Sequence, residues 1–219
     1  MDLIFTNGKK LKVGTFYGIG KNYAKHAKEM GGEIPEEPII FIKPGSSYIP
    51  DGGTILLPHF SENVHHEVEL VVVIGKECRN IKKEEAIEYI AGYAVGLDVT
   101  LRDIQNKAKK EGNPWAISKG FATSAPVSKV APVEDFMGFT PDFMLELKIN
   151  GELRQKAYTI DLLHPVDELI EYLSNIFVLE PGDCIFTGTP EGVGPIHAGD
   201  KLFAELLGIV SLEVTAEMK

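Results

Sequence analysis

Apolar residues gather in short runs along the chain, and one of these runs dominates the pattern. Residues 70–74 are all apolar, four of the five are β-branched, and Gly75 closes the run. A run of this kind, bounded by a turn residue, predicts a buried strand. We expect further strands at residues 11–19, 38–43, 54–57, 92–97, 143–149, 152–158 and 184–187, and in the last segment up to residue 214. Asn150-Gly151 lies between two of them and is typical of a two-residue hairpin turn.

Other segments have the spacing or the end residues of helices. Residues 23–30 place four side chains on one helical face, those of Tyr23, His26, Ala27 and Met30. Asn22 precedes this segment as the expected cap. Further helices are expected at residues 82–90, 101–110 and 164–176. Because the elements do not alternate as in a parallel α/β sheet, we predict a mixed α/β, mostly β roll with a few short helices.

Two carboxylates stand at the start of the dominant apolar run. Glu67 and Glu69 are two residues apart, so strand alternation places them on one face. Neighbouring carboxylates repel each other, and their compensation is either a hard metal ion or a pair of basic side chains. A solvated strand end that binds nothing is the third interpretation. His65 shares the face by the same alternation, and a His-Glu-Glu set would favour a transition metal.

Asp98 ends the apolar run at residues 92–97. A carboxylate at the end of a buried strand is a natural third ligand for the Glu67 and Glu69 pair, and the start of a turn is its other common role. Lys119 is a lone basic residue among small and apolar neighbours. The glycine-rich segment 188–194 offers backbone N–H groups that could hold an anion, or it is a plain connection.

A histidine and a carboxylate are three residues apart on the first expected helix. His26 and Glu29 can therefore touch. A carboxylate that holds one imidazole nitrogen leaves the other free to act as a base. An ordinary surface pair is the alternative. The glycines around Gly18 and Gly20 do not form a dinucleotide fingerprint, because Tyr23 stands where the third glycine is required.

Composition narrows the class of protein. The chain has 219 residues, 44% hydrophobic and 25% charged, which is typical of a globular protein. A formal net charge of −10 argues against nucleic acid as a partner. Two cysteines give no disulfide framework, and neither a leader nor a membrane span of about 20 apolar residues is visible. We expect one domain over residues 1–219, in the cytoplasm and without a membrane partner.

Seven motifs follow one another over nearly the whole chain. They are Gly20-Lys21-Asn22-Tyr23-Ala24-Lys25-His26, Phe41-Ile42-Lys43-Pro44, His66-Glu67-Val68-Glu69-Leu70, Gly96-Leu97-Asp98-Val99-Thr100-Leu101-Arg102-Asp103, Ser118-Lys119-Gly120-Phe121, Asn150-Gly151-Glu152, and Glu180-Pro181-Gly182-Asp183 through Thr187-Gly188-Thr189-Pro190 to Gly192-Val193-Gly194. In this order they resemble the fumarylacetoacetate hydrolase family, in particular its short acylpyruvase-like members. The resemblance implies a mixed β-sandwich roll, usually a homodimer.

The resemblance also assigns roles to residues. It implies Mg²⁺ or Mn²⁺ bound by Glu67, Glu69 and Asp98, without His65. His26 and Glu29 would form a catalytic dyad, and Lys119 would be the catalytic cation near the metal. Arg102, Gln105 and Thr189 would bind the acid end of the substrate, with Lys43 in support. Apart from the resemblance, Phe16, Tyr17, Trp115 and Ile117 are candidates for lining the pocket and setting the size of the substrate.

The expected reaction is metal-dependent cleavage of short 2-oxo acids. Acylpyruvates would be hydrolysed to pyruvate and a carboxylic acid, and oxaloacetate would be decarboxylated through the same enolate. The alternatives on this scaffold are 2-hydroxyhepta-2,4-diene-1,7-dioate isomerase or decarboxylase activity and oxaloacetate tautomerase activity. A non-catalytic protein that binds an oxo acid or a metal is the alternative from another class.

Overall fold

Two sheets packed face to face form the body of the protein in the computed structural model, which describes residues 1–29, 35–136 and 140–219. The larger sheet follows the order β4 (Ile39–Lys43), β3 (Phe16–Gly20), β15 (Cys184–Phe186), β8 (Val68–Ile74), β9 (Ile90–Leu97), β11 (Ala125–Val127) and β5 (Tyr48–Pro50), with β12 (Ala131–Pro132) also on β9. The smaller sheet follows the order β14 (Glu152–Tyr158), β13 (Met144–Ile149), β17 (Lys201–Leu206), β18 (Val210–Met218) and β6 (Thr54–Leu57). The mostly β fold is as predicted.

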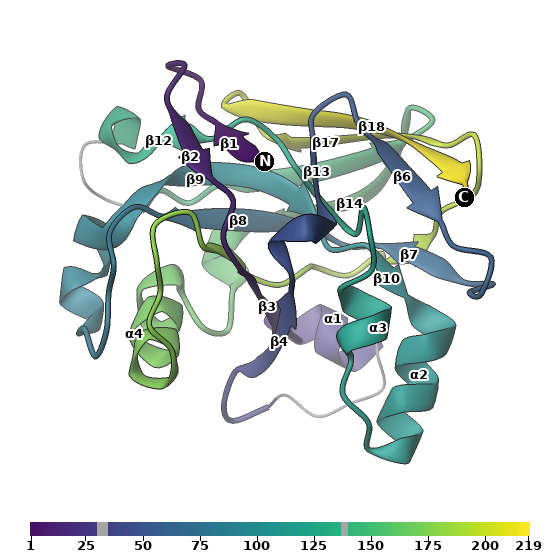
Figure 1. The fold of residues 1–219 in the computed structure, drawn as a ribbon, viewed down its shortest axis with the longest axis horizontal. Helices are drawn as coiled ribbons and strands as arrows, with labels where there is room; N and C mark the ends of the chain where they lie inside the picture. The colour runs from purple at the N-terminus through teal and green to yellow at the C-terminus, as the bar shows by residue number, and fades with distance from the viewer. Residues whose placement is uncertain (30–34, 137–139) are drawn as a thin grey trace.

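Two small sheets and short helices complete the structure. The small sheets are β1 (Asp2–Ile4) with β2 (Lys10–Lys12), and β10 (Thr100–Leu101), β7 (Val64–His66) and β16 (Gly194–Pro195). The α-helices are α1 (Ala24–Glu29), α2 (Arg102–Glu111), α3 (Ala116–Lys119) and α4 (Val166–Ile176), and the 3-10 helices are η1 (Gly45–Ser47), η2 (Lys83–Tyr89), η3 (Val133–Phe136) and η4 (Thr159–Asp161). In Figure 1 the smaller sheet lies at the top, with β8 and β9 beneath it and the four α-helices below.

The central strand β8 is apolar at nearly every position because both of its faces are covered. Leu70 belongs to a core cluster shared with the smaller sheet, which contributes residues such as Leu147. Val71 points to the other face and belongs to a second cluster with Leu3 of the N-terminal hairpin. Buried apolar area stabilises the fold by roughly 25 cal/mol per Å². The carboxylates at the start of this strand are therefore held by a rigid core.

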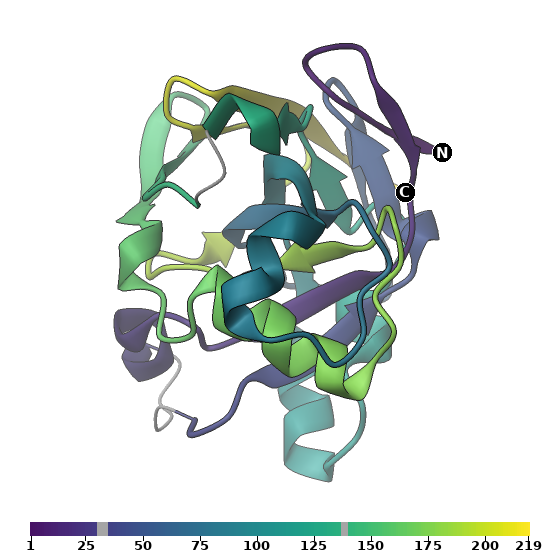
Figure 2. The same cartoon turned by 90° about the vertical axis from the view of Figure 1, so that its left-hand side faces the viewer.

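Three sequence expectations need correction. The expected strand at residues 11–19 is divided, since Gly14 N–H donates to Gly182 O (2.9 Å) and Thr15 N–H to Asp183 Oδ1 (2.7 Å). The expected helix at 82–90 is the 3-10 helix η2, which lies beside α4 in Figure 2. Helix α1 begins at Ala24, and the expected end at Met30 lies outside the described residues.

The remaining helices and the hairpin were placed correctly to within a few residues. Asn150 and Gly151 have φ values of 53° and 84°, as the left-handed turn between β13 and β14 requires. Across the three described ranges, no helix combines the length and the apolar character needed to cross a membrane.

Candidate active site

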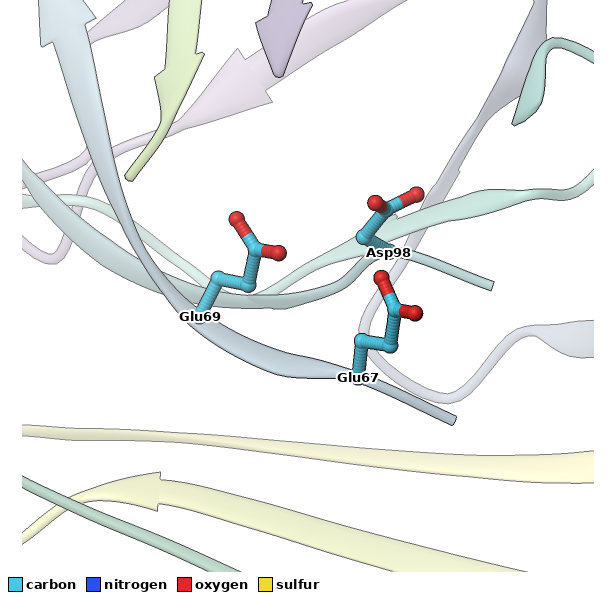
Figure 3. Close-up of side chains that lie close together, drawn as sticks. All are labelled: Glu67, Glu69 and Asp98. Atoms are coloured by element: carbon cyan, nitrogen blue, oxygen red, sulfur yellow. The ribbon is translucent and has the colours of Figure 1, made fainter. Parts of the chain in front are cut away.

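Three buried carboxylates converge at one end of the larger sheet. Glu67, Glu69 and Asp98 each offer an oxygen atom, and these oxygen atoms lie within 4.8 Å of one another. The three residues are at most 4% exposed. Figure 3 shows the carboxyl groups of all three pointing into the same space. Such a set of hard oxygen donors is suited to Mg²⁺ or Mn²⁺.

The backbone explains why these three residues meet. Strands β8 and β9 are antiparallel neighbours, and Glu69 stands opposite Gly96, two residues before Asp98. Beyond the last pair of the two strands, Asp98 N–H donates to Glu67 O at 2.8 Å. The end of β9 and the start of β8 therefore place Asp98 and Glu67 side by side.

His65 does not join the carboxylates, although simple alternation placed it on their face. Glu67 lies between β7 and β8, where the chain passes from the three-stranded sheet to the larger one, so the alternation is interrupted. His65 Nε2 lies 2.9 Å from Asn63 Oδ1, and Arg102 Nε donates to His65 Nδ1 at 3.4 Å. Burial, then the Arg102 charge, lower the pKa of His65 to about 4.

Three buried cations surround the carboxylates. Lys119 Nζ donates to Glu67 Oε2 and to Thr100 Oγ1, both at 2.7 Å, and also contacts Asp98. Arg102 is paired with the other oxygen of Glu67. Lys43 Nζ lies 2.7 Å from Asp98 Oδ1. Three carboxylates thus face three cations, so a divalent metal ion would leave the site net positive and suited to an anionic substrate.

The three carboxyl groups are electrostatically unequal. Burial raises the pKa of Glu69 well above its ordinary value, and the negative charges of Asp98 and Glu67 add to this effect. Burial also raises the pKa of Asp98, although Lys119 and Lys43 oppose it. At Glu67 the same burial is outweighed by Lys119 and Arg102, which hold its pKa well below the usual range. Glu69 is therefore the carboxyl group that would gain most from a bound cation.

His26 and Glu29 form the expected pair on α1. His26 Nδ1 lies 3.3 Å from Glu29 Oε2, and His26 is 5% exposed and lines the same pocket as the carboxylates. Burial lowers the pKa of His26, and the charges of Glu67 and Glu29 oppose this only in part. A largely neutral imidazole held by a carboxylate is a suitable proton acceptor at neutral pH.

The glycine-rich segment 188–194 does hold anions, but they are carboxylates of this chain. Gly188 N–H donates to Glu69 Oε2 at 2.7 Å, and Gly192 N–H donates to Glu29 at 3.3 Å. Thr189 lines the pocket and donates its hydroxyl to Val68 O at 2.9 Å. This segment therefore positions a metal-ligand candidate and the dyad carboxylate together.

Two buried polar residues fix this arrangement: Gln155, which sequence reasoning missed, and Asn22, to which it gave a different role. Gln155 Nε2 donates to Thr189 Oγ1 at 2.9 Å, and Val68 N–H donates to Gln155 Oε1 at 3.0 Å. Asn22 does not act as the expected cap: its Nδ2 donates to Thr187 O at 2.8 Å and its Oδ1 accepts from His164 N–H at 2.8 Å. The available signal for Gln155 was weak, since neighbouring positions on β14 are exposed.

The carboxylates open into a narrow pocket of about 30 Å³. Its polar lining includes eight of the nine expected site residues, all except Glu29. Phe41, Trp115, Lys21 and Lys109 also line it. Of the four candidates for substrate size, only Trp115 is in this lining; Phe16 and Tyr17 are buried in the core, and Ile117 is 65% exposed. Phe41 was not foreseen as a pocket residue.

The family described as fumarylacetoacetate (FAA) hydrolase C-terminal matches residues 15–216. The chain belongs to the fumarylacetoacetate hydrolase family. This confirms the resemblance drawn from the seven motifs, and the match spans every candidate site residue from His26 to Thr189.

Relatives and solved structures give the family context. The chain is 48% identical to the mitochondrial oxaloacetate tautomerase FAHD1 of Arabidopsis thaliana, over 92% of this chain and 90% of the relative. It is 44% identical to oxaloacetate tautomerase FAHD1 of Homo sapiens, over 91% and 90%. The structure of fumarylpyruvate hydrolase from Pseudomonas aeruginosa with Mn²⁺ and pyruvate aligns with a TM-score of 0.94 at 37% identity, covering 100% of this chain and 96% of that one.

Proposed function

We propose that this protein is a metal-dependent enzyme that acts on short 2-oxo acids through their enol forms. The observation that carries the proposal is that a candidate cation site and a candidate proton acceptor share one pocket. Three carboxylates form a cation site, and a buried imidazole held by Glu29 lines the same space. A 2-oxo acid can contact the cation and the imidazole at the same time. Its carboxylate and keto oxygens suit the cation, and its C3 carbon carries the proton that the imidazole would transfer.

The donor set supports Mg²⁺ or Mn²⁺ as the cofactor. All three candidate ligands are carboxylates, and burial followed by repulsion from Asp98 and Glu67 raises the pKa of Glu69, an effect that a divalent cation would oppose. When bound, such an ion would act as a Lewis acid on the carboxylate and keto oxygens of the substrate. The fumarylpyruvate hydrolase relative was solved with Mn²⁺. In this proposal Glu67, Glu69 and Asp98 hold the ion.

His26 is the proton-transfer group in the proposed mechanism. With Glu29 on Nδ1, its Nε2 is free to take a proton from a water molecule or from substrate C3. Lys119 supplies positive charge where negative charge develops on the substrate oxygen. Arg102, Gln105 and Thr189 line the pocket and bind and orient the acid end of the substrate.

Cleavage is the first candidate reaction. For an acylpyruvate, His26 accepts a proton from water, hydroxide adds to the distal ketone, and the C–C bond breaks to give a carboxylic acid and the enol form of pyruvate. For oxaloacetate, CO₂ leaves and no water attack is required. Protonation at C3 yields pyruvate in both cases. The fumarylpyruvate hydrolase structure, similar over the whole chain, supports this reaction.

Tautomerisation of oxaloacetate is the second candidate reaction. Relatives named oxaloacetate tautomerase, 48% and 44% identical over nine tenths of the chain, favour it. Here His26 moves a proton between substrate C3 and solvent, and no bond between carbon atoms breaks. The same residues therefore serve both candidates, and only the fate of the enol differs.

One parallel assay separates these functions. The purified protein with Mg²⁺, with Mn²⁺ or with EDTA is given acetylpyruvate, fumarylpyruvate and oxaloacetate, while pyruvate release and the ultraviolet absorbance of enol-oxaloacetate are followed. Metal-dependent pyruvate from the acylpyruvates supports cleavage. Enol loss without pyruvate supports tautomerisation, and release from oxaloacetate alone supports decarboxylation. Ligand binding with no turnover of any substrate would contradict the enzyme proposal.

The assembly and the location belong to the same proposal. We infer a homodimer of single-domain chains, which sedimentation of the purified protein at several concentrations tests. A cytoplasmic location stays a prediction, since the two tautomerase relatives are named mitochondrial. Fractionation of the source cells would decide it.

A further inference from the structure

Helix α2 presents three polar side chains to the pocket in a line. Arg102, Gln105 and Lys109 are at positions i, i+3 and i+7 of the helix, and all three line the pocket. The first two are buried, and Arg102 Nη1 donates to Gln105 Oε1 at 2.6 Å. Lys109 is exposed and lies about one turn beyond Gln105 along the helix. The row therefore runs from the carboxylates toward the mouth of the pocket.

Lys109 differs from the inner cations in its surroundings. Lys43, Arg102 and Lys119 are each paired with a carboxylate. Within residues 1–29, 35–136 and 140–219, no carboxylate oxygen lies within 4.0 Å of Lys109 Nζ. Its ammonium group instead lies 5.1 Å from the ring centroid of Trp115, which also lines the pocket. An aromatic face can hold such a cation in place.

The charge around Lys109 favours an anion. Partial burial of its ammonium group, then repulsion by Arg102 and Lys119, lower its pKa to about 8. Lys21 lines the same pocket and adds another positive charge. The carboxylates of the site are balanced by their own cations, so the charge of Lys109 is available to a ligand. An anionic group beside it would relieve the repulsion among the cations.

We propose that Lys109 binds the carboxylate at the far end of a dicarboxylic 2-oxo acid. This inference rests on the proposed function, in which the acid end of the substrate lies at Glu67, Glu69 and Asp98. Lys109 then selects dicarboxylates over 2-oxo acids of the same length with an uncharged far end. Trp115 is a positioning residue, since it acts through the ammonium group that it holds.

Three variants of the full chain test the assignment on turnover. Lys109→Met removes the charge, Lys109→Arg keeps it, and Lys110→Met makes the same change at the next residue, which does not line the pocket. For fumarylpyruvate we expect Lys109→Met to lower kcat/KM by roughly 10- to 100-fold, mainly through KM. For acetylpyruvate, whose far end is a methyl ketone, we expect less than about a twofold change. Lys109→Arg should retain the preference, as should Lys110→Met.

A binding experiment makes the test independent of turnover. In the presence of Mn²⁺, calorimetry compares 2-oxoglutarate with 2-oxopentanoate, which has a methyl group in place of the far carboxylate. We expect the wild type to bind 2-oxoglutarate more tightly and Lys109→Met to lose this preference. If this binding preference is found but no substrate is turned over, the proposed reaction is overturned and the proposed role of Lys109 in binding is retained. Equal losses for both acids in Lys109→Met, or no preference in the wild type, would overturn the inference about Lys109.

Discussion

At the scale of single residues, the three carboxylates differ in how their charge is compensated. Glu67 is paired with Lys119 and Arg102, and Asp98 is paired with Lys119 and Lys43. Within the described ranges Glu69 has no such ion pair and accepts one backbone N–H, that of Gly188. A buried carboxylate without a cationic partner is costly. A bound cation would therefore stabilise Glu69 more than the other two carboxylates.

Replacing this carboxylate should separate metal binding from stability. Glu69→Gln keeps the shape of the side chain and an oxygen for Gly188 N–H but removes the negative charge. We expect Mn²⁺ affinity to fall at least about tenfold. In EDTA we expect the Tm to stay equal or rise, because the repulsion with Asp98 and Glu67 is gone. Calorimetric titration and thermal unfolding measure the two effects. Unchanged Mn²⁺ affinity would remove Glu69 from the ligand set.

Lys43 should matter for the fold as much as for the site. It is 1% exposed, it lies 2.7 Å from Asp98 Oδ1, and its Nζ donates to Val99 O (3.1 Å) and Ser124 O (2.8 Å). Lys43→Met leaves a buried charge with one cation fewer, so we expect a loss of about 3 kcal/mol in the free energy of unfolding, measured in urea.

A matched control for this change is available on the surface. Lys83→Met removes an ion pair with Glu168 in which both side chains are more than 40% exposed. We expect little change in the free energy of unfolding, because solvent screens such pairs. If Lys43→Met and Lys83→Met changed the free energy of unfolding equally, the burial of Lys43 would not add to its contribution to stability.

At the scale of elements, the hydrophobic pattern of the sequence predicted a strand best where that strand stays in one sheet. The continuous apolar run at 70–74 identified β8 because both faces of that strand are buried, and Asn150-Gly151 identified the β13–β14 hairpin. Alternation failed at His65, because the chain changes sheets at Glu67. Periodicity at 82–90 could not distinguish an α-helix from the observed 3-10 helix. These local patterns carry no information on how distant strands pair.

The loop after β15 is an element whose backbone conformation serves the site. Gly188 has φ +104°, and a Cβ atom there would lie 2.6 Å from Asn22 Cβ. We expect Gly188→Ala to destabilise the protein by roughly 2 kcal/mol or more. The substitution should also weaken Mn²⁺ binding, because the hydrogen bond from Gly188 N–H to Glu69 shifts with the loop. Urea unfolding and calorimetry measure both effects.

Gly208 provides the control for backbone strain alone. It also has a positive φ, +75°, but a Cβ atom there would meet nothing within 4 Å. Gly208→Ala should cost about 1 kcal/mol of stability and leave Mn²⁺ affinity unchanged. If Gly188→Ala left the affinity equally unchanged, the loop would not position Glu69.

At the scale of the whole molecule, the site is assembled from segments that are far apart in the sequence. The residues that line one pocket come from separate segments of the chain: His26, Glu67, Asp98, Lys119 and Thr189. The seven motifs named these residues in advance, but residue spacing alone left each role open. Gln155 and Lys109 were not foreseen, because the contact of Gln155 with Thr189 and the place of Lys109 at the pocket depend on the tertiary fold.

The local charge of the pocket also differs from the net charge of the whole chain. The chain carries a formal −10, yet Lys43, Arg102 and Lys119 balance the three carboxylates, and Lys109 and Lys21 add positive charge at the pocket. A metal ion would make the pocket more positive still. An acidic protein can therefore select an anionic substrate by local charge.

The most direct test of the central claim is the exchange of the methyl protons of pyruvate with deuterated water, followed by NMR. This exchange proceeds through the enol form and requires no decision between cleavage and tautomerisation. We predict rapid exchange with Mg²⁺, loss of exchange in EDTA and in His26→Gln, and normal exchange in His197→Gln, a control at an exposed histidine. Exchange that persists in His26→Gln or in EDTA would contradict metal-dependent proton transfer by His26.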